Sequence, residues 1–374
     1  MPDYHIQNPN NQINKTFTTE ILKNSEAQTY HQTLAEYKQT PLVELKNLAA
    51  KYGMGNIYVK DESHRFGLNA FKGLGASYAI FKTLQTDKNV STFCTATDGN
   101  HGRAVAWASK KEDKKAVVFV PRDTVESRIK SIENEGAKVI VIDGNYDRTC
   151  EAAAKACEEY GWKLIQDTSS EGYEEIPAQI MAGYLTHFQE LEGTLHPVSN
   201  SKIDVVFLQA GVGSWAAAGI WYYLNRYGNQ KPKIVLVEPY ESDGILASFK
   251  AGKPVTPQGN FKTIMAGLNC GIPSLSAWDI IKNGADISIK IKDNYTIDAI
   301  KQLYNPIGND EQIISGESGA AGLAGFLTVM DQASLVKVKE ELNLNANSNI
   351  LFFNTEGATD PINYSKIVGG SDDY

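Results

Sequence analysis

Several features that would point to a metal site, a disulfide-stapled domain or a nucleic-acid partner are missing from this chain. No CxxC pair occurs among the four cysteines, Cys94, Cys150, Cys157 and Cys270, and a chain of 374 residues needs no disulfides to build a core. No HxxH or HExxH pair occurs among the six histidines, so a metal site has no support. A net charge of −8 without a basic run argues against nucleic acid or an anionic membrane as the main partner.

Long apolar runs are also scarce. The stretch Val205–Leu224 is apolar over about the length of a membrane span, but Gln209 and Gly211 lie among the residues that interrupt it. We interpret it as a strand, a turn and a helix, and expect no membrane association. Residues 1–12 are polar and contain no apolar signal region, so we expect a cytoplasmic protein.

The composition is that of a soluble globular protein. Hydrophobic residues make up 42% of the chain and charged residues 21%, enough to form a sizeable core. A length of 374 residues exceeds one ordinary domain, so we expect one large domain or two intimate ones. Neither an internal repeat nor a low-complexity linker is present, which favours an inserted second domain over a tethered one.

Short β-rich runs alternate with helical segments along the chain. The expected strands are Ile57–Lys60, Thr92–Ala96, Ala116–Val120, Val139–Ile142, Lys163–Gln166, Val205–Gln209, Ile234–Glu238, Ser288–Ile291 and Ile350–Phe353. The expected helices include Ala70–Leu84, Ala104–Lys111, Val125–Glu135, Asp147–Glu159 and Trp215–Tyr227. This alternation predicts an α/β fold of βαβ units with largely parallel sheet. Such sheets bind ligands beyond the carboxyl ends of their strands, where the informative glycines and polar residues fall.

The first candidate cluster surrounds Lys72, at the start of an apolar helix rich in glycine and alanine. Its neighbours include Ala70, Phe71 and Gly73, so we expect the amine to be partly desolvated. Desolvation and a helix N-terminus both disfavour the ammonium form, which would lower the pKa of the amine and free its lone pair for Schiff-base formation. A solvated lysine near a helix N-terminus is the plain alternative.

The second cluster, Thr95–Arg103, follows an expected strand and opens a helix. Gly99 and Gly102 allow the backbone to approach a planar ligand. Asn100 can hydrogen-bond an oxygen on that ligand, and Asp98 projects a carboxylate into the same opening. Simple capping of the helix by these two side chains is the alternative.

The third cluster, Leu208–Ala216, runs from a strand through a glycine turn into a helix. Its backbone N–H groups and the helix N-terminus form an anion cradle suited to phosphate. The spacing Gly211-x-Gly213-x-x-Ala216 also fits a dinucleotide fingerprint, and Glu238 closes the next strand where a ribose-binding acid would lie. A nicotinamide-dependent dehydrogenase is therefore an alternative, although it leaves the first two clusters without a role.

The fourth cluster, Leu351–Gly357, is a strand that ends in a hydroxyl and an acid. Thr355 can accept or donate one hydrogen bond to a ring nitrogen. Capping of the turn by this threonine is the alternative.

Together, the ordered motifs AFK, TDGNHG, GVGS and NTEG resemble those of the fold-type II pyridoxal-phosphate (PLP) enzymes, the superfamily of tryptophan synthase β and threonine dehydratase. Within it the chain resembles the diaminopropionate ammonia-lyases over KDESHRFGLNAFKGLGASYAI, TATDGNHGRAVAWA, QDTSSEGYEEIPAQIMAGY, LQAGVGSWAAA, IMAGLNCGIPSLSAW, ISGESGAAGLA and NTEGATDP. The resemblance covers Thr40–Tyr364, and these stretches lie within it. The resemblance implies two open, twisted, mostly parallel sheets flanked by helices. It also implies a large PLP-binding domain (residues 1–88 and 196–374) with an inserted smaller domain (89–195).

The resemblance assigns cofactor roles to the matching positions. Lys72 would carry PLP as a Schiff base, Asn100 would bond the pyridine hydroxyl oxygen, and Thr355 would meet the pyridine nitrogen. The phosphate would lie on Gly211, Val212, Gly213 and Ser214. A hydroxyl at the ring nitrogen does not enforce a protonated ring, which suits α,β-elimination.

The resemblance further implies a homodimer that acts on a small amino acid. Dehydratases of the superfamily usually carry a small or hydroxyl residue where Asp98 stands, whereas a carboxylate suits a substrate with a β-ammonium group. The substrate site would comprise Thr97, Asp98, Gly99, His101, Asp167 and Glu171. The expected reaction removes ammonia from D- or L-2,3-diaminopropionate to give aminoacrylate, then pyruvate and a second ammonia. Lys72 and Asp98 would take the Cα proton from opposite stereoisomers.

A serine or threonine dehydratase, or a β-replacement synthase of the same superfamily, stays open as an alternative that needs no acid at position 98. Some residues also depart from the family pattern. His64 stands where a tyrosine is expected, and Ser274 stands where a cysteine is often found, so Cys270 would lack a partner. Ser169 and Ser170 replace an alanine and an aromatic residue, and would widen the pocket for a related β-substituted amino acid.

Overall fold

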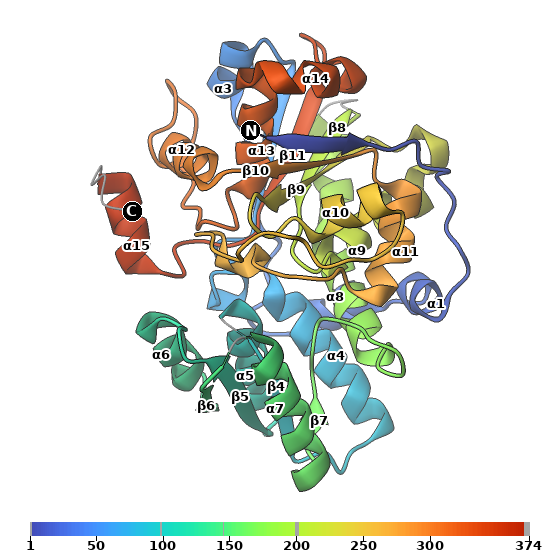
Figure 1. Ribbon diagram of the computed structural model, residues 1–374, viewed down its shortest axis with the longest axis vertical. Coiled ribbons are helices and arrows are strands. Elements are labelled where there is room, and N and C mark those ends of the chain that lie inside the picture. Colours follow the sequence, from blue (N-terminus) through green and yellow to red (C-terminus); the bar gives the residue numbers. More distant parts are fainter. Residues whose placement is uncertain (1, 98, 145, 199–201, 370–374) are drawn as a thin grey trace.

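Two β-sheets organise the chain, one above the other in Figure 1. The computed structural model describes residues 2–97, 99–144, 146–198 and 202–369. The larger, 7-stranded sheet has the order β1 (Asp3–Ile6), β10 (Ile287–Ile291), β9 (Lys233–Pro239), β8 (Val205–Gln209), β11 (Asn349–Asn354), β3 (Asn56–Asp61) and β2 (Leu42–Glu44). The smaller, 4-stranded sheet has the order β6 (Lys138–Ile142), β5 (Lys115–Pro121), β4 (Thr92–Ala96) and β7 (Lys163–Leu164).

The strands are mostly parallel, as the alternation of strands and helices predicts. All pairings in the smaller sheet are parallel. In the larger sheet the inner pairings are parallel, and only the edge strands β1 and β2 pair antiparallel with their neighbours. Both edge strands are short and lie in N-terminal segments where the residue pattern predicts no strand. The expected α/β class with two open sheets is confirmed.

Helices cover both faces of the larger sheet because its strands are apolar on both sides. Along β8, Val206 and Leu208 face the core beneath α4, α8, α9 and α11, while Val205 and Phe207 face the core beneath α3, α12, α13 and α14. This alternation is the two-residue period of a strand. The helices are α1 (Phe17–Lys23), α2 (Ala27–Thr33), α3 (Lys46–Tyr52), α4 (Lys72–Thr86), α5 (Asn100–Lys111), α6 (Glu126–Asn134), α7 (Tyr146–Tyr160), α8 (Glu175–Val198), α9 (Ser214–Tyr227), α10 (Gly244–Ala251), α11 (Leu275–Gly284), α12 (Asp293–Tyr304), α13 (Ala321–Asp331), α14 (Val336–Leu342) and α15 (Pro361–Gly369).

The apolar stretch Val205–Leu224 forms β8, a turn and most of α9, as predicted. Among the described residues, no helix is long and apolar enough to cross a membrane. We propose that residues 89–195 form the inserted smaller unit, since every strand of the smaller sheet lies within that range. Most of helix α8 lies in the same range, but the helix packs against α1, α2 and α9 as well as α4.

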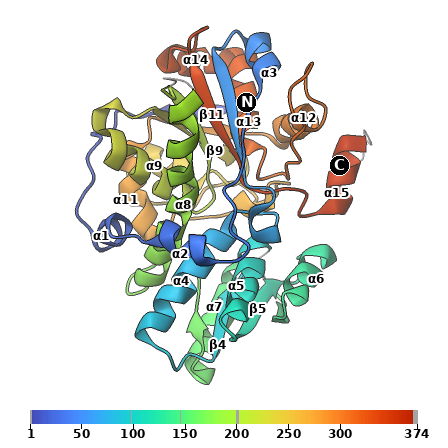
Figure 2. The same ribbon diagram turned by 180° about the vertical axis from the view of Figure 1, so that it is seen from behind.

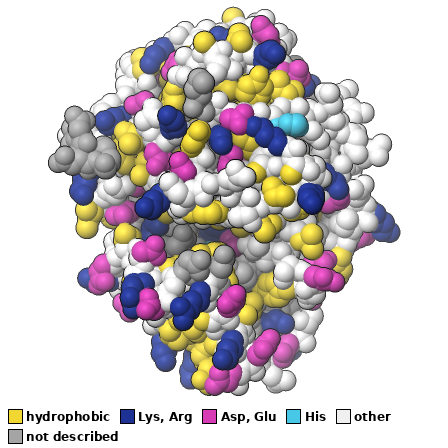
Figure 3. Space-filling model, viewed as in Figure 1, with side chains coloured by type: hydrophobic (Ala, Val, Ile, Leu, Met, Phe, Trp, Pro, Cys, Tyr) yellow, Lys and Arg dark blue, Asp and Glu magenta, His cyan; other side chains and the backbone are white. Residues whose placement is uncertain are grey.

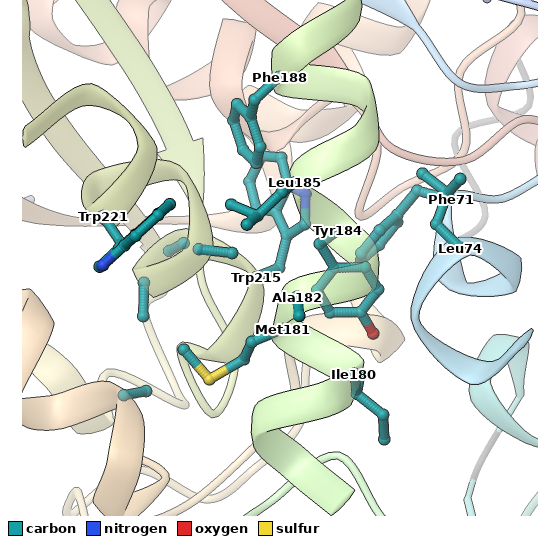
Figure 4. Packing of buried hydrophobic residues seen from close by; sticks show 14 of the residues in the cluster. Phe71, Leu74, Ile180, Met181, Ala182, Tyr184, Leu185, Phe188, Trp215 and Trp221 are labelled. Atoms are coloured by element: carbon teal, nitrogen blue, oxygen red, sulfur yellow. The ribbon is translucent and has the colours of Figure 1, made fainter. Parts of the chain in front are cut away.

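An aromatic cluster joins α4, α8 and α9 behind the larger sheet (Figure 4). The rings of Phe71 and Trp215 lie 5.6 Å apart, and those of Phe188 and Trp215 lie 5.7 Å apart. Phe188 is fully buried, so its truncation to alanine would cost about 3–5 kcal/mol. The cluster fixes the starts of α4 and α9, and both helix starts face the cavity described below.

A buried ionic network, composed of Lys60, Glu62, Arg65 and Glu190, holds the segment between β3 and α4. The Arg65 guanidinium donates to Glu62 (Nε to Oε2, 2.8 Å) and to Glu190 (Nη2 to Oε2, 2.8 Å), and all of these side chains are at most 1% exposed. Lys60 Nζ lies 2.5 Å from Glu190 Oε2 and donates to the Thr40 carbonyl at 2.7 Å. Each charge therefore has several partners, as buried charges require.

Candidate active site

The carboxyl ends of strands from both sheets meet at one cavity, as expected for open parallel sheets. The cavity holds about 950 Å³ of space, part of it open to solvent. Strand ends β4 and β8 contribute Ala96 and Gln209 to its wall, and the segments after β7 and β11 contribute Asp167 and Thr355. Other lining residues include Phe71, Lys72, Thr97, Asn100, His101, Tyr146, Tyr184, Gly211, Val212, Gly213, Ser214, Trp215, Cys270, Ser318 and Glu356.

Lys72 is the first residue of α4, and its amine is paired with a carboxylate. Nζ donates to Asp167 Oδ2 at 2.5 Å, with the two side chains 20% and 11% exposed. Burial lowers the pKa of Lys72, but the Asp167 carboxylate more than offsets that effect and the net pKa is raised. The lowered amine pKa expected from desolvation alone is therefore wrong, because an anion 95 residues away in the sequence stabilises the ammonium.

Asp167 is held in its ionised form by the same pair. Burial raises the pKa of its carboxyl, but the ammonium of Lys72 lowers that pKa further than burial raises it. His101 Nε2 donates to the Ile165 carbonyl at 2.8 Å, so its Nδ1 carries a lone pair, 3.9 Å from Asp167 Oδ2. Burial lowers the pKa of His101 and keeps the ring neutral. Two predicted substrate-site residues thus lie together beside Lys72.

The loop after β4 brings Thr97 and Asn100 to the cavity. Thr97 Oγ1 accepts a hydrogen bond from Gly99 N at 3.0 Å, which shapes the turn. Asn100 is the first residue of α5, and its Nδ2 donates to Glu356 Oε2. Asp98, the predicted catalytic acid, lies outside the described residues.

The glycine turn after β8, where the anion cradle is predicted, precedes α9 and lines the cavity. Gly213 adopts φ +90°, a left-handed conformation that favours glycine. A Cβ at Gly211 would lie 2.9 Å from Cys270 Sγ, so a side chain there would crowd the cradle. Ser214 Oγ donates to the Asp167 carbonyl at 2.7 Å, which ties the cradle to the loop that pairs with Lys72.

The residues that depart from the family pattern bond to one another. Ser169 N donates to Ser274 Oγ at 2.9 Å, and the two hydroxyl oxygens lie 2.8 Å apart. Ser274 N in turn donates to the Val212 carbonyl at 2.8 Å. Because the Ser169 hydroxyl also accepts from Ser276 N at 2.8 Å, it serves to hold the loop. This finding does not support the expectation that Ser169 widens the pocket.

Some expected residues lie away from the cavity, and some of its residues were missed. Glu171 and His64 are exposed and do not line it. Substrate binding by Glu171 therefore stays a prediction, and its exposed position does not support it. Tyr184 and Gln209 carry no signal of a site in the sequence, because neither stands in a glycine turn or carries a charge. Glu356 was noted as an acid but given no partner, although its place in the same motif as Thr355 was a signal.

The dehydrogenase alternative fails at Glu238. That side chain is fully buried, and its two oxygens accept hydrogen bonds from Ile245 N at 2.7 Å and Leu246 N at 2.8 Å. Burial raises the pKa of the carboxyl to about 8. Because Glu238 is buried and bonded to the first N–H groups of α10, it cannot bind a ribose. The Gly-x-Gly turn therefore lacks the ribose-binding acid of a dinucleotide site.

A wider cleft leads from the cavity to the surface between the two sheets. It holds about 3030 Å³ of space, part of it open to solvent, and shares Tyr146, Val212 and Cys270 with the inner cavity. The space-filling view shows a hollow across the middle of this face (Figure 3), and the view from behind shows α4 running downward from the middle of the molecule (Figure 2). The described residues contain no cluster of potential metal ligands.

Comparison with known proteins places this site in a family. Residues 33–350 match the model of the pyridoxal-phosphate dependent enzymes. Diaminopropionate ammonia-lyase of Escherichia coli strain K12 is 40% identical over 91% of this chain and 90% of its own length. That of Salmonella typhimurium strain LT2 is 38% identical over 91% and 90%. The crystal structure of the E. coli enzyme with an aminoacrylate–PLP azomethine intermediate has a TM-score of 0.92 and 38% identity, covering 98% of this chain and 97% of that one.

Fold, site and family match define a PLP-dependent enzyme of fold type II, and the chain belongs to that family. Within it, the chain belongs with the diaminopropionate ammonia-lyases. The residues present fit the cofactor. A primary amine, a backbone cradle that a Cβ would crowd, and a hydroxyl at a strand end line one cavity.

Proposed function

We propose that this chain is a carbon–nitrogen lyase that releases ammonia from 2,3-diaminopropionate. The α,β-elimination breaks the Cα–H and Cβ–N bonds and gives aminoacrylate. Water then converts aminoacrylate to pyruvate and a second ammonia. The relatives' names supply the substrate, and the charges of the cavity fit it.

The single observation that carries the proposal is the buried carboxylate of Asp167, 2.5 Å from Lys72 Nζ. Once its amine is bonded to the cofactor, Lys72 would no longer offer this anion a free ammonium. An unpaired buried charge is costly, so the site favours a substrate that brings its own cation. Diaminopropionate carries a β-ammonium, whereas serine and threonine carry a neutral hydroxyl at the same carbon.

The cofactor would be held by residues from both sheets. Lys72 would bind its aldehyde carbon covalently, Asn100 would bond its ring oxygen and Thr355 its ring nitrogen. The phosphate would lie on the N–H groups of residues 211–214, at the positive end of α9. When bound, PLP supplies the electron sink that stabilises negative charge at Cα.

Lys72 and Asp98 would take the Cα proton from opposite faces of the bound substrate. The proposal predicts that Asp98→Asn suppresses the reaction of the D-isomer more than that of the L-isomer, by about 10²-fold or more. The measurement is kcat for each isomer. Equal losses for both isomers would contradict the two-base arrangement.

The direct test is pyruvate release by the purified, PLP-loaded protein from D- and L-2,3-diaminopropionate, with L-serine beside them. Release from either isomer of diaminopropionate, with little from serine, is the expected result. Release from serine alone would assign a dehydratase. Absence of pyruvate from all three would refute the proposed activity.

We also infer a homodimer in the cytoplasm. The family resemblance supports the dimer, and the lack of a disulfide among the cysteines of the described residues fits a reducing compartment. Sedimentation of the loaded protein at twice the mass of 41.0 kDa is the expected result, and sedimentation at that mass itself would refute the dimer.

A further inference from the structure

The amide of Gln209, the last residue of β8, has an orientation that its surroundings settle. Its Nε2 faces three backbone oxygens: Phe353 O at 2.9 Å, Ser318 O at 3.2 Å and Gly319 O at 3.3 Å. Carbonyl oxygens only accept hydrogen bonds, so the NH₂ group must be the one that faces them. Its Oε1 lies on the other side, 3.3 Å from the position of a Cβ on Gly322, and has no donor among the described residues.

The orientation of Gln209 determines the role of the Thr355 hydroxyl. The same Nε2 lies 2.9 Å from Thr355 Oγ1, and because Nε2 has no lone pair to offer, Thr355 must accept this bond. The threonine is 3% exposed and lines the cavity, and no other hydrogen bond of its side chain is formed within the described part of the chain. Its own hydrogen is therefore left to point into the cavity.

A hydroxyl that offers a hydrogen matches a ring nitrogen that has a lone pair. A protonated ring nitrogen would require Thr355 to accept a second hydrogen bond, and the hydrogen of the hydroxyl would then need another partner in a buried site. We propose that Gln209 is a positioning residue that holds Thr355 as a donor and so keeps the ring nitrogen of the cofactor unprotonated. This inference rests on the proposed placement of the ring nitrogen at Thr355.

The proposal gives Gln209 a function that simple packing does not require. A side chain that merely filled the space beneath the sheet could be replaced by an apolar one of similar length. Removal of the amide donor leaves Thr355 free to rotate and accept from a protonated ring. We expect the pKa of the ring nitrogen to rise by about one to two units in Gln209→Met, the equivalent of one buried hydrogen bond.

The test is ¹⁵N NMR of the holoenzyme loaded with ring-¹⁵N-labelled PLP, recorded from pH 6 to 9. In the wild type, the resonance should stay at the unprotonated position across this range. In Gln209→Met it should move toward the protonated position as the pH falls, and in Gln209→Asn, which retains a donor amide on a shorter side chain, it should lie between the two. Thr355→Val is the control that removes the hydroxyl without altering Gln209.

A protonated ring in the wild type would overturn the proposal and requires no variant to fold. An unchanged resonance in a loaded Gln209→Met protein would overturn it equally. The outcome is separable from the proposed activity. A protonated ring in an enzyme that releases pyruvate from diaminopropionate refutes only the role of Gln209. An unprotonated ring in an enzyme that releases none refutes only the activity.

Discussion

Two lysines of this protein lie 2.5 Å from a carboxylate, and they illustrate two uses of the same pair. Lys60 and its partner Glu190 are both 1% exposed and belong to the buried ionic network. Lys72 and Asp167 are 20% and 11% exposed and have few other partners. In the network, each charged group has several partners. In the cavity, the Asp167 carboxylate depends on the single cation of Lys72.

The pKa values of the two amines move in opposite directions. Burial lowers the pKa of Lys60 more than its neighbouring carboxylates raise it, and the Arg65 cation adds to the lowering. Asp167 outweighs burial at Lys72 and raises its pKa. An ion pair shared with another cation stabilises the fold, while an isolated pair at a cavity can exchange its cation. The contrast distinguishes Lys60, a structural lysine, from Lys72, the lysine that we propose binds the cofactor.

The largest effect that this contrast predicts is on Lys72→Ala. Loss of the amine should abolish the absorbance of the protein-linked cofactor and reduce pyruvate release by about 10⁴-fold, because no other lysine lines the described part of the cavity. The protein without cofactor should melt at a lower temperature, because the Asp167 carboxylate loses the cation that it is paired with. A retained absorbance band would contradict the assignment of Lys72.

The buried ionic network should respond in the opposite manner. Glu190→Gln leaves Lys60 and Arg65 facing a neutral amide, which should lower the free energy of unfolding by about 3–5 kcal/mol. Urea denaturation of the purified variant measures the loss. The protein that remains folded should retain most of its kcat. Unchanged stability with lost activity would place this network in the catalytic machinery instead.

A smaller effect is expected from Asp167→Asn. The neutral amide cannot hold a β-ammonium as the carboxylate does, so kcat/KM for diaminopropionate should fall by about 10²-fold. The variant should lose less on serine, which brings no second cation. Steady-state kinetics with both substrates provides the comparison, and an equal loss on both would show that Asp167 does not select the substrate.

The pH dependence of cofactor loading follows from the raised pKa of Lys72. Only the neutral amine attacks an aldehyde, so the loading rate should rise with pH throughout the neutral and mildly alkaline range, about tenfold per unit while the amine remains mostly charged. In Asp167→Asn the pKa falls, and the rate should level off at a lower pH. Stopped-flow absorbance after mixing with PLP follows both. Identical profiles would contradict the influence of Asp167.

The smallest effect concerns the hydroxyl pair at the edge of the cavity. Ser169→Ala removes hydrogen bonds to Ser274 and Ser276, and should lower the free energy of unfolding by about 1 kcal/mol. It should also raise KM more than it lowers kcat, since the loop that bears Asp167 loosens. The matched control is Ser170→Ala, because Ser170 is exposed. Equal effects of Ser169→Ala and Ser170→Ala would show that the hydroxyl pair does not hold the loop that bears Asp167.

Periodicity and turn chemistry predicted most of the fold. The runs Thr92–Ala96 and Val205–Gln209 coincide with β4 and β8, because continuous apolar segments between turns leave little choice of structure. The edge strands β1 and β2 were missed, since a short strand with one neighbour needs no apolar pattern. The glycine motif at Gly211 and Gly213 likewise lies at the cavity, where the cradle is proposed. Nearness in space between Lys72 and Asp167, or between Gln209 and Thr355, depends on strand order, which local sequence does not encode.

Residues that follow strands of both sheets line the cavity, so a cofactor bound there would link the two sheets. Ser214 follows a strand of the larger sheet, whereas Asn100 follows a strand of the smaller one. A molecule bound by both strengthens the two sheets together, by about 4 kcal/mol at a thousand times its Kd. In calorimetry, the loaded protein should therefore melt in one transition whose temperature climbs with PLP concentration. Removal of PLP should let the smaller sheet melt first.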